Sequence, residues 1–279
     1  MRTRRTISLW YLGTMAVAAV AMLAGAQRPQ APPPPPSTPP QTSSSSVDLT
    51  KARSAEPSVM DEPLKLISQA AKHYQEVSDY TCTLVKRERI NGQLQQENVV
   101  DMRVRTQPFS VYMKWSEPHS MANQEVCYIA GKNKGMMRVK AHGLGSIAGF
   151  VSIDPGDPRA SETSHHKINE AGIGNLIERT AKAWEYDARV GMTEAHTADY
   201  KFQDRPVTQV EIVHTKEGKG QFPFYRSVFY FDKETHLPVR VENYGWPAQN
   251  GEKNGDLMEV YNFVDLKLNV GLPEGMFNK

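Results

Sequence analysis

The stretch from residue 79 to residue 115 alternates between apolar and polar side chains and carries a tight turn in its middle. One alternating run ends at Ile90, Asn91 and Gly92 follow, and a second run continues to Arg105. Asn-Gly between two such runs is a strong hairpin signal, because both residues tolerate a positive φ. The stretch therefore predicts neighbouring antiparallel strands.

The same alternation predicts a sheet with one apolar face and one charged face. Pro108 ends the second run, and a third run begins at Phe109. The apolar set is Tyr80, Cys82, Leu84, Val100, Met102, Val104, Phe109, Val111, Met113 and Trp115. The outward set is Arg87, Arg89, Asp101, Arg103, Arg105 and Lys114. The function of the chain then depends on what covers or fills the apolar face.

Two amphipathic helices are predicted to lie on apolar surface of this kind. The first begins at Asp61, which can cap it, with Pro63 in the first turn, where a missing N–H costs little. Its apolar positions are Leu64, Ile67, Ala71, Tyr74 and Val77. The second helix carries Ile173, Ile177, Thr180, Ala181 and Trp184 on one side. Both sets recur at helical spacing, and the sheet is the nearest surface that could receive them.

Further strands are predicted over residues 125–130, 136–140, 207–214, 225–232, 237–244 and 257–266. Residues 142–170 interrupt them with a stretch that is rich in glycine and has no clear periodicity. Long loops of this kind are often functional or mobile. Runs of antiparallel strands with segregated helices indicate an α+β fold rather than one built from βαβ units.

The first 26 residues have the features of an export signal. Arg2, Arg4 and Arg5 precede the apolar run 7–23, and Ala-Gly-Ala at 24–26 fits the small-x-small cleavage rule. The apolar run approaches the length of a membrane span, so an uncleaved anchor is the alternative. In either case we expect an exported protein of the periplasm or cell envelope.

Residues 27–60 form a segment rich in proline and serine, with five consecutive prolines at 32–36. This composition buries too little apolar surface to fold, so we expect a disordered linker, followed by one domain over residues 61–279. Without the signal the chain has 30 Lys and Arg residues against 31 Asp and Glu residues. No basic excess remains, and nothing in this balance indicates a nucleic-acid partner.

Cys82 and Cys127 are the two cysteines of the chain, and both fall in predicted strands. An oxidising compartment would allow a disulfide between them, although strand geometry can keep two cysteines apart. Two buried free thiols are the alternative, because pairing cannot be read from spacing.

Several segments together resemble a bacterial exported family of unknown function. They are DYTCTLVKRERINGQL from residue 79, PFSVYMKW from 108, GIGNLIER from 172, FYFDKETHLPVRVENYGWP from 229 and YNFVDLKLNVGLPEGMF from 261. That family in turn resembles the periplasmic carriers and outer-membrane receptors that sort lipoproteins. The cues for this second resemblance are F-D-x-x-T-x-L-P-V-R at 231–240, the final aromatic-Asn-Phe strand, and Leu272-Pro273 before Phe277.

The resemblance implies a strongly curved antiparallel half-barrel with helices closing its concave face. In carriers that cavity holds acyl chains, so the resemblance implies a lipid or an acylated protein as partner. It brings no catalytic residues and no cofactor. For the lining of such a cavity we expect Met102, Met113, Trp115, Leu176, Ile177 and Trp184. The alternative is an envelope interaction module whose half-barrel is fully packed and whose charged outer face binds a protein.

Three patterns that could carry chemistry lack the context that the chemistry needs. Residues 143–148 satisfy G-x-G-x-x-A, but no helix or parallel strand is predicted after them, so a glycine loop is expected. His165 and His166 lie near carboxylates on a loop, but the spacing fails the usual ligand patterns, so no metal site is predicted. Glu88 and Asp101 alternate with arginines on the expected solvent face, which favours cross-strand ion pairs over a catalytic pair.

The positive charges on the outer strand face raise one further possibility, contact with anionic lipid at a membrane surface. Acidic residues interrupt that face, and charged exposed strands also serve solubility. Membrane contact is therefore an expectation, and it depends on where these charged side chains lie in the folded protein.

Overall fold

The computed structural model describes residues 58–158, 164–248 and 253–279, which belong to one compact unit. The predicted export signal lies outside the described residues, as does the predicted linker up to residue 57. The described helices are α1 (Asp61–Tyr74) and α3 (Ile173–Val190). The strands are β1 (Asp79–Ile90), β2 (Gln93–Leu94), β3 (Asn98–Arg105), β4 (Ser110–Glu117), β5 (Glu125–Ile129), β6 (Met137–Lys140), β7 (Val151–Ile153), β8 (Thr193–Phe202), β9 (Arg205–His214), β10 (Arg226–Asp232), β11 (Pro238–Tyr244) and β12 (Leu257–Leu268). Short 3₁₀ helices are η1 (His119–Met121), η2 (Asn133–Gly135), η3 (Gly143–Ala148), η4 (Ile168–Glu170), η5 (Lys216–Gly218) and η6 (Glu274–Phe277).

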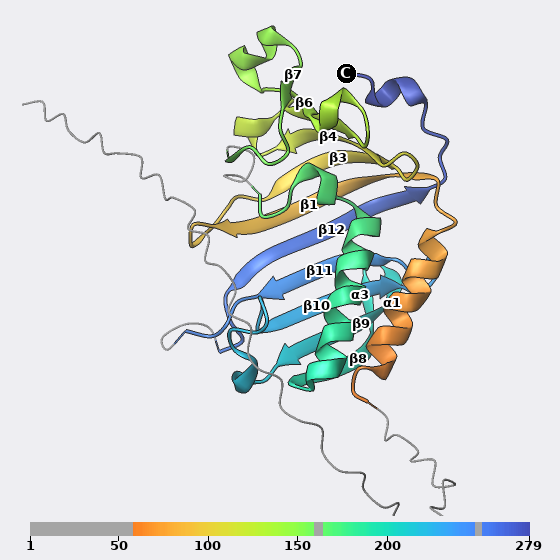
Figure 1. Cartoon of the computed structure of the whole chain (residues 1–279), viewed down its shortest axis with the longest axis vertical. Coiled ribbons are helices and arrows are strands. Elements are labelled where there is room, and N and C mark those ends of the chain that lie inside the picture. Colours follow the sequence, from red (N-terminus) through yellow and green to blue (C-terminus); the bar gives the residue numbers. More distant parts are fainter. Residues whose placement is uncertain (1–57, 159–163, 249–252) are drawn as a thin grey trace, which may run out of the picture. The chain divides into compact units, whose positions relative to one another are not determined.

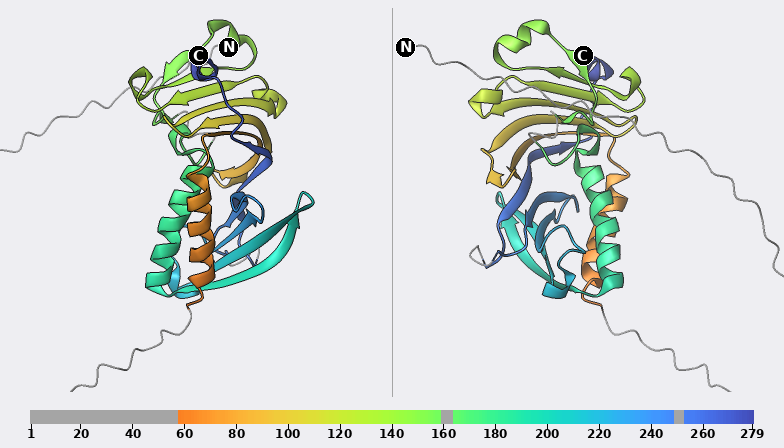
Figure 2. Two further views of the ribbon diagram at one scale, coloured as in Figure 1. Left: turned by 90° about the vertical axis from the view of Figure 1, so that its right-hand side faces the viewer. Right: turned by 60° about the vertical axis from the view of Figure 1, so that its left-hand side comes forward.

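The described strands form one twelve-stranded antiparallel sheet in the order β7-β6-β5-β4-β3-β1-β12-β11-β10-β9-β8, with β2 paired to β1. Two meanders meet at its centre, because the first long strand, β1, pairs with the last, β12. The order ends at β7 and β8 without closure, and Figures 1 and 2 show the sheet curling around the helices. The predicted α+β half-barrel is the observed fold.

The hairpin predicted at Asn91-Gly92 connects β1 to β2. Asn91 has φ 50° and Gly92 has φ 79°, the conformation that favours these two residues in tight turns. Beyond the turn, β3 and β4 follow with Cys82 opposite Met102 and Met102 opposite Met113. Their side chains therefore share the concave face, as the alternation predicted.

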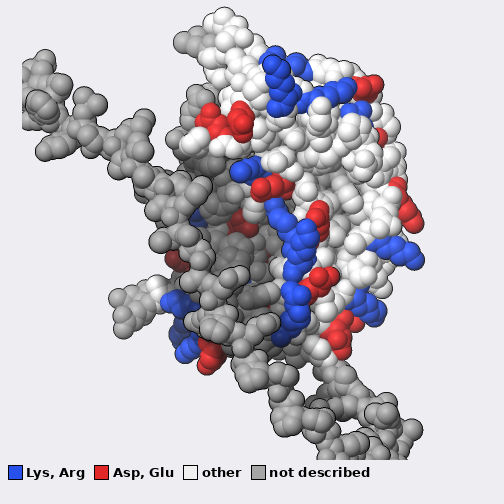
Figure 3. Space-filling model, viewed as in Figure 1, with Lys and Arg blue, Asp and Glu red and all other residues white. Residues whose placement is uncertain are grey.

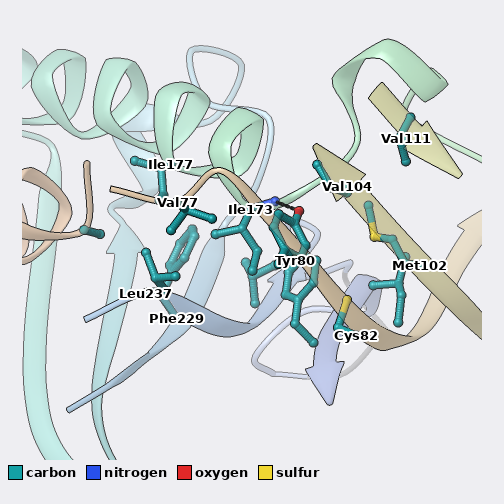
Figure 4. Close-up of a cluster of buried hydrophobic side chains, with 14 of the residues drawn as sticks. Val77, Tyr80, Cys82, Met102, Val104, Val111, Ile173, Ile177, Phe229 and Leu237 are labelled. Atoms are coloured by element: carbon teal, nitrogen blue, oxygen red, sulfur yellow. Dashed lines mark hydrogen bonds between the residues drawn. The ribbon is translucent and has the colours of Figure 1, made fainter. Parts of the chain in front are cut away.

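The two helices cover the part of the concave face formed by β8 to β11 (Figures 1 and 2). Trp184 of α3 packs edge-on against Phe229 of β10, with ring centroids 5.0 Å apart. Trp184 and Ile177 are 2% and 3% exposed, and Leu237 beside β11 is completely buried. Figure 4 shows part of this core. Side chains from the segment just after α1, from the first turns of α3 and from both meanders pack against one another there.

A hydrogen bond inside the core fixes the start of α3. The backbone N–H of Ile173 donates to the hydroxyl of Tyr80, at 2.8 Å, and Tyr80 is fully buried (Figure 4). Gly172 precedes this contact with φ 93°, and a Cβ there would lie 2.7 Å from the same hydroxyl. Only glycine therefore allows the chain to approach Tyr80 so closely.

Four local features differ from the sequence predictions. The cap of α1 is Met60, not Asp61, whose carboxylate instead accepts from the N–H of Ser58. Met60 is 1% exposed, so the folded part begins before residue 61. Strands β7 and β8 were not predicted. β7 has three residues, and β8 lies at the sheet edge with most of its side chains exposed, so neither shows a strong apolar alternation.

The convex face is partly covered by the end of the chain. Phe277 of η6 is 1% exposed and packs with Tyr112, Cys127 and Ile129. The carboxylate of Asp79 accepts the backbone N–H groups of residues 270, 271 and 272, which holds the approach to η6. This face is therefore less open to solvent than the sequence predicted.

The possible disulfide between Cys82 and Cys127 is not formed, and both thiols are free and buried. Cys82, Met102, Met113 and Val126 are successive cross-strand partners, so they share one face. Cys127 follows Val126 and points to the other face, with two strands between it and β1. Burial raises the pKa of both thiols, that of Cys127 to about 11.

None of the described helices is both long and apolar enough to span a membrane.

Candidate functional site

A cavity of about 400 Å³ lies on the concave face beside the first turns of α3. Strands of the first meander form most of its wall, joined by β11 and β12, and residues 164–172 with the start of α3 form its cover. This volume falls at the lower end of the roughly 300–1,000 Å³ that is usual for small-molecule sites. The cavity is therefore large enough to hold a ligand of modest size.

Most of the sheet wall of the cavity is apolar. Its principal side chains are Leu84, Met113, Trp115, Val126, Val139 and Phe263. The indole N–H of Trp115 donates to Oδ1 of Asn98 at 2.8 Å. Because its polar atom is already satisfied, the ring can offer apolar surface to the cavity.

The cover of the cavity is apolar in one part and polar in the other. Ile168, Ala171 and Leu176 contribute apolar side chains. Ser164, His166, Lys167, Glu170 and Arg179 line the polar part, together with Lys86 and Tyr261 of the sheet. The site thus combines an apolar interior with one polar edge.

Two buried carboxylates organise that polar edge. The side chains of Glu88 in β1 and Glu259 in β12 are 3% and 4% exposed. Together with Tyr261, His165 and His166 they form what we term the carboxylate cluster. Oε1 of Glu88 accepts from the Tyr261 hydroxyl at 2.5 Å and from the backbone N–H of His165 at 2.9 Å.

Two further donors contact Glu88. Its Oε2 accepts from Nζ of Lys86 at 2.6 Å, and its Oε1 also accepts from Oγ of Ser164 at 3.0 Å. A buried carboxylate is tolerated when donors surround it in this way. Burial raises the pKa of Glu88, but the charge and hydrogen bond of Lys86 outweigh it and leave that pKa lowered.

Both histidines contact the second carboxylate. Nδ1 of His165 and Nε2 of His166 lie 3.0 Å and 3.1 Å from Oε2 of Glu259. Burial would raise the pKa of Glu259, but these two hydrogen bonds hold it well below its ordinary range. Burial and the charges of Glu259 and Glu88 raise the pKa of Tyr261, which therefore stays a neutral donor.

The cluster connects segments that are far apart in the sequence. Ser164, His165 and His166 belong to the segment before α3, whereas Glu88 and Glu259 belong to the two central strands. Their hydrogen bonds hold the cover of the cavity on the sheet. The polar edge therefore fixes the geometry of the apolar interior beside it.

The six residues expected to line a cavity divide into two equal groups. Met113, Trp115 and Leu176 line the cavity. Met102, Ile177 and Trp184 do not line this cavity, because they are packed in the core at 0%, 3% and 2% exposure. Contact between the first three and a ligand stays a prediction.

The prediction that Glu88 lies on the solvent face is wrong, because its side chain is 3% exposed. Glu88 shares the strand parity of Leu84 and Lys86, so it points to the concave side and is buried. Parity alone could have shown this. The pairing of two adjacent histidines with Glu259 could not be read from spacing, because 93 residues separate His166 from that carboxylate.

The other sequence patterns that could have carried chemistry lie outside the cavity and the carboxylate cluster. The glycine motif at 143–148 is the 3₁₀ helix η3, and β7 after it pairs antiparallel with β6, which is not a dinucleotide-binding context.

Asp101 pairs with Arg103 at 2.8 Å on the partly exposed convex side. Figure 3 shows charges of both signs interleaved on the opposite, helix-covered face. Membrane contact through either face stays a prediction.

These features define an α+β half-barrel with a cavity on its concave face rather than a nucleotide-binding or βαβ protein. The chain belongs to the family described as a protein of unknown function, DUF1571, whose model matches residues 77–279. The predicted membership in a family of unknown function is thereby confirmed. No curated protein matches the sequence.

Solved structures with a similar arrangement are distant in sequence. An uncharacterized conserved protein of Thermus thermophilus has 9% identity and a TM-score of 0.45, over 78% of this chain and 93% of its own. The lipoprotein LppX of Mycobacterium tuberculosis has 9% identity and a TM-score of 0.43, over 76% and 98%. A LolA superfamily protein of Nitrosomonas europaea has 12% identity and a TM-score of 0.35, over 77% and 96%.

Proposed function

We propose that this protein binds the acyl chain of a lipid or of an acylated protein in the cavity beside α3, and that it does so without catalysing a reaction. The observation that carries the proposal is the cavity of about 400 Å³ with an apolar wall that the helices leave unfilled. Burying apolar surface contributes about 25 cal/mol per Å², which a methylene chain in such a space would gain.

The distribution of charge supports an amphiphile rather than a pure hydrocarbon. An acyl chain would contact Met113, Trp115 and Leu176, and its headgroup or linkage would lie at the polar edge near Lys167 and Arg179. The modest volume favours one chain over several.

The location expected from the sequence agrees with this function. An export signal over residues 1–26 would carry the domain to the periplasm or cell envelope, where lipids and lipoproteins are found. The proline-rich linker over residues 27–57 would separate the domain from a membrane if the signal stayed uncleaved.

The two alternative functions have less support. A fully packed interaction module requires the concave face to be filled, and the cavity is inconsistent with that condition. For an enzyme, the relevant pair is Lys86 Nζ and Ser164 Oγ, 3.1 Å apart, which resembles a serine–lysine arrangement. Because Lys86 donates to Glu88 at 2.6 Å as an ammonium, it has no lone pair to accept the hydroxyl proton, and we do not propose hydrolysis.

A fluorescent fatty-acid probe tests the proposal. The full chain, delipidated in purification, is titrated with the probe, and the variant Leu176→Trp is titrated in parallel. Leu176 is half-buried and lines the cavity, so tryptophan there would occupy the space that the chain needs. We expect saturable binding by the wild type and a loss of at least tenfold in affinity for the variant.

Leu66→Trp is the matched control, because Leu66 is a half-buried leucine on α1 that does not line the cavity. It should bind the probe as the wild type does. Absence of saturable binding in the wild type would overturn the proposal, as would equal affinity in the Leu176 and Leu66 variants.

A further inference from the structure

The carboxylate cluster brings together three atoms of the kinds that bind divalent metals. Among the residues that the structure describes, one ligand atom each from Glu88, His165 and Glu259 lie within 4.8 Å of one another. The donors come from β1, from the segment before α3 and from β12. A metal at about 2.0–2.2 Å from an imidazole nitrogen and carboxylate oxygens holds its ligand atoms about 3–4 Å apart, so small side-chain adjustments would bring these three atoms to one ion.

The hydrogen bonds of His165 fix which nitrogen is available. Nε2 lies 3.1 Å from the carbonyl oxygen of Arg89, and a carbonyl can only accept, so Nε2 carries a hydrogen. In the neutral imidazole Nδ1 then presents a lone pair, and it lies 3.0 Å from the Glu259 oxygen. Two lone pairs facing each other repel, so a positive centre must lie between them, either a proton or a metal ion.

The three donor side chains make hydrogen bonds of the kind that orient metal ligands in proteins. Metal-ligating histidines commonly donate their second N–H to a carbonyl, as His165 does to Arg89. The other oxygen of Glu259 accepts from Nδ2 of Asn243 at 2.7 Å, and the other oxygen of Glu88 accepts from Lys86. Both carboxylates are thereby oriented with one oxygen toward the cluster, and a metal on Oε1 of Glu88 would replace one of the hydrogen bonds that this oxygen accepts from Tyr261, Ser164 and the backbone N–H of His165.

The second histidine is oriented as a hydrogen-bond donor. Nη1 of Arg179 lies 3.4 Å from Nδ1 of His166 and can only donate to it. Nε2 of His166 therefore carries the hydrogen and donates to Glu259. This leaves one imidazole and two carboxylates as the donor set, which suits Zn²⁺ and other divalent first-row metals.

We propose that a divalent transition-metal cation binds to Nδ1 of His165 and to the carboxylates of Glu88 and Glu259. The cation joins the segment before α3 to β1 and β12 and so fastens the cover of the cavity. The side chain of His165 is 31% exposed, which gives the ion a route from solvent to two carboxylates that are otherwise buried. The site does not depend on whether the cavity holds a ligand.

Metal titration of the full chain, without an affinity tag and freed of metal by a chelator, tests the site. Zn²⁺ affinity is measured by competition with a chromophoric chelator, and Co²⁺ is added to a second sample for its visible absorption. We expect one equivalent of either metal, Co²⁺ bands typical of low-coordinate nitrogen and oxygen ligation, and a higher melting temperature with Zn²⁺.

The variants separate the proposed site from surface histidines. His165→Ala changes a partly exposed loop residue, and Zn²⁺ affinity should fall at least tenfold with loss of the Co²⁺ bands. His196→Ala removes an exposed histidine of β8 and should leave both unchanged. Absence of stoichiometric Zn²⁺ binding, or equal affinity in the His165 and His196 variants, would show that a proton alone bridges His165 and Glu259 and would overturn the proposal.

Discussion

The concave face has two regions that the chain covers in different ways. Over β8 to β11, α1 and α3 bury Ile67, Ile177 and Trp184 in the core, and the interface is packed around Trp184 and Phe229. Over β3 to β7, the cover is the irregular segment up to residue 172, and a cavity of about 400 Å³ remains. Regular helices can interdigitate with a sheet at crystal-like density, whereas the irregular segment 164–172 places polar side chains such as Ser164, His166 and Lys167 at the edge of the cavity and leaves its interior unfilled.

This difference explains how one alternating pattern gives both a core and a site. The apolar residues of β1, β3 and β4 look alike in sequence, yet their surroundings depend on which segment lies above them. Met102 is completely buried, and its cross-strand partner Met113 lines the cavity. The cover, rather than the strand, decides which apolar residue is available to a ligand.

The largest effect should come from opening the packed region. Trp184→Ala removes a ring that is 2% exposed, and we expect a loss of about 3–5 kcal/mol in the free energy of unfolding. Denaturant unfolding followed by circular dichroism measures it. Glu185→Ala, at an exposed position on the same helix, should change stability by no more than about 0.5 kcal/mol. If Trp184→Ala lowered the free energy of unfolding as little as Glu185→Ala does, this region would not be packed as described.

The two methionines give the sharpest test of the difference between the regions. Met102→Ala should cost about 2–5 kcal/mol of unfolding free energy, because the side chain is surrounded by core atoms. Met113→Ala should cost about 1–2 kcal/mol less, because part of its surface faces the cavity and has no partner atoms to lose. Denaturant unfolding of both variants measures this difference. Equal losses would argue against a cavity beside Met113.

A smaller effect is expected where the two regions meet. Tyr80→Phe leaves the N–H of Ile173 without its acceptor in a buried place, and we expect a loss of about 1–3 kcal/mol. Chemical denaturation measures the loss, and hydrogen exchange at the start of α3 should become faster. Tyr200→Phe, at a tyrosine that is 56% exposed, is the control and should cost less than about 0.5 kcal/mol. Unchanged exchange in the Tyr80 variant would contradict the role given to its hydroxyl.

No effect is expected from reductant, because Cys82 and Cys127 lie on opposite faces as free thiols. The melting temperature should be the same with and without dithiothreitol. Burial raises the pKa of both thiols, so iodoacetamide should modify neither in the folded protein and both after unfolding, as mass spectrometry would show. A reductant-dependent melting temperature would contradict the placement of the two cysteines.

Periodicity predicted most of the strands and both helices, whereas the half-barrel was expected from the family resemblance. Alternation gave the faces of β1, β3 and β4, and helical spacing gave α1 and α3 to within a few residues at most ends. Met113, Trp115 and Leu176 were expected as lining from the apolar faces together with the family resemblance, and all three lie at the cavity. That signal could not separate them from Met102, Ile177 and Trp184, because burial against a partner and exposure to a cavity select the same residue types.

The polar edge was missed for a different reason. Glu88, His165 and Glu259 are distant in sequence and meet only because β1 and β12 pair at the centre of the sheet. A pattern confined to one segment cannot reveal such a meeting. The parity of β1 did place Glu88 on the concave face, and a carboxylate predicted on an apolar face would have been the signal to seek its partners.

The most direct test of the central claim is native mass spectrometry of the full chain, purified from its own envelope fraction, with lipid extraction of the same sample. If the loosely covered region is a binding site, the wild type will carry an acyl-containing mass that is absent from Leu176→Trp and retained by Leu66→Trp. A wild-type protein that carries no such mass, and whose extract contains no acyl species above background, would contradict the account.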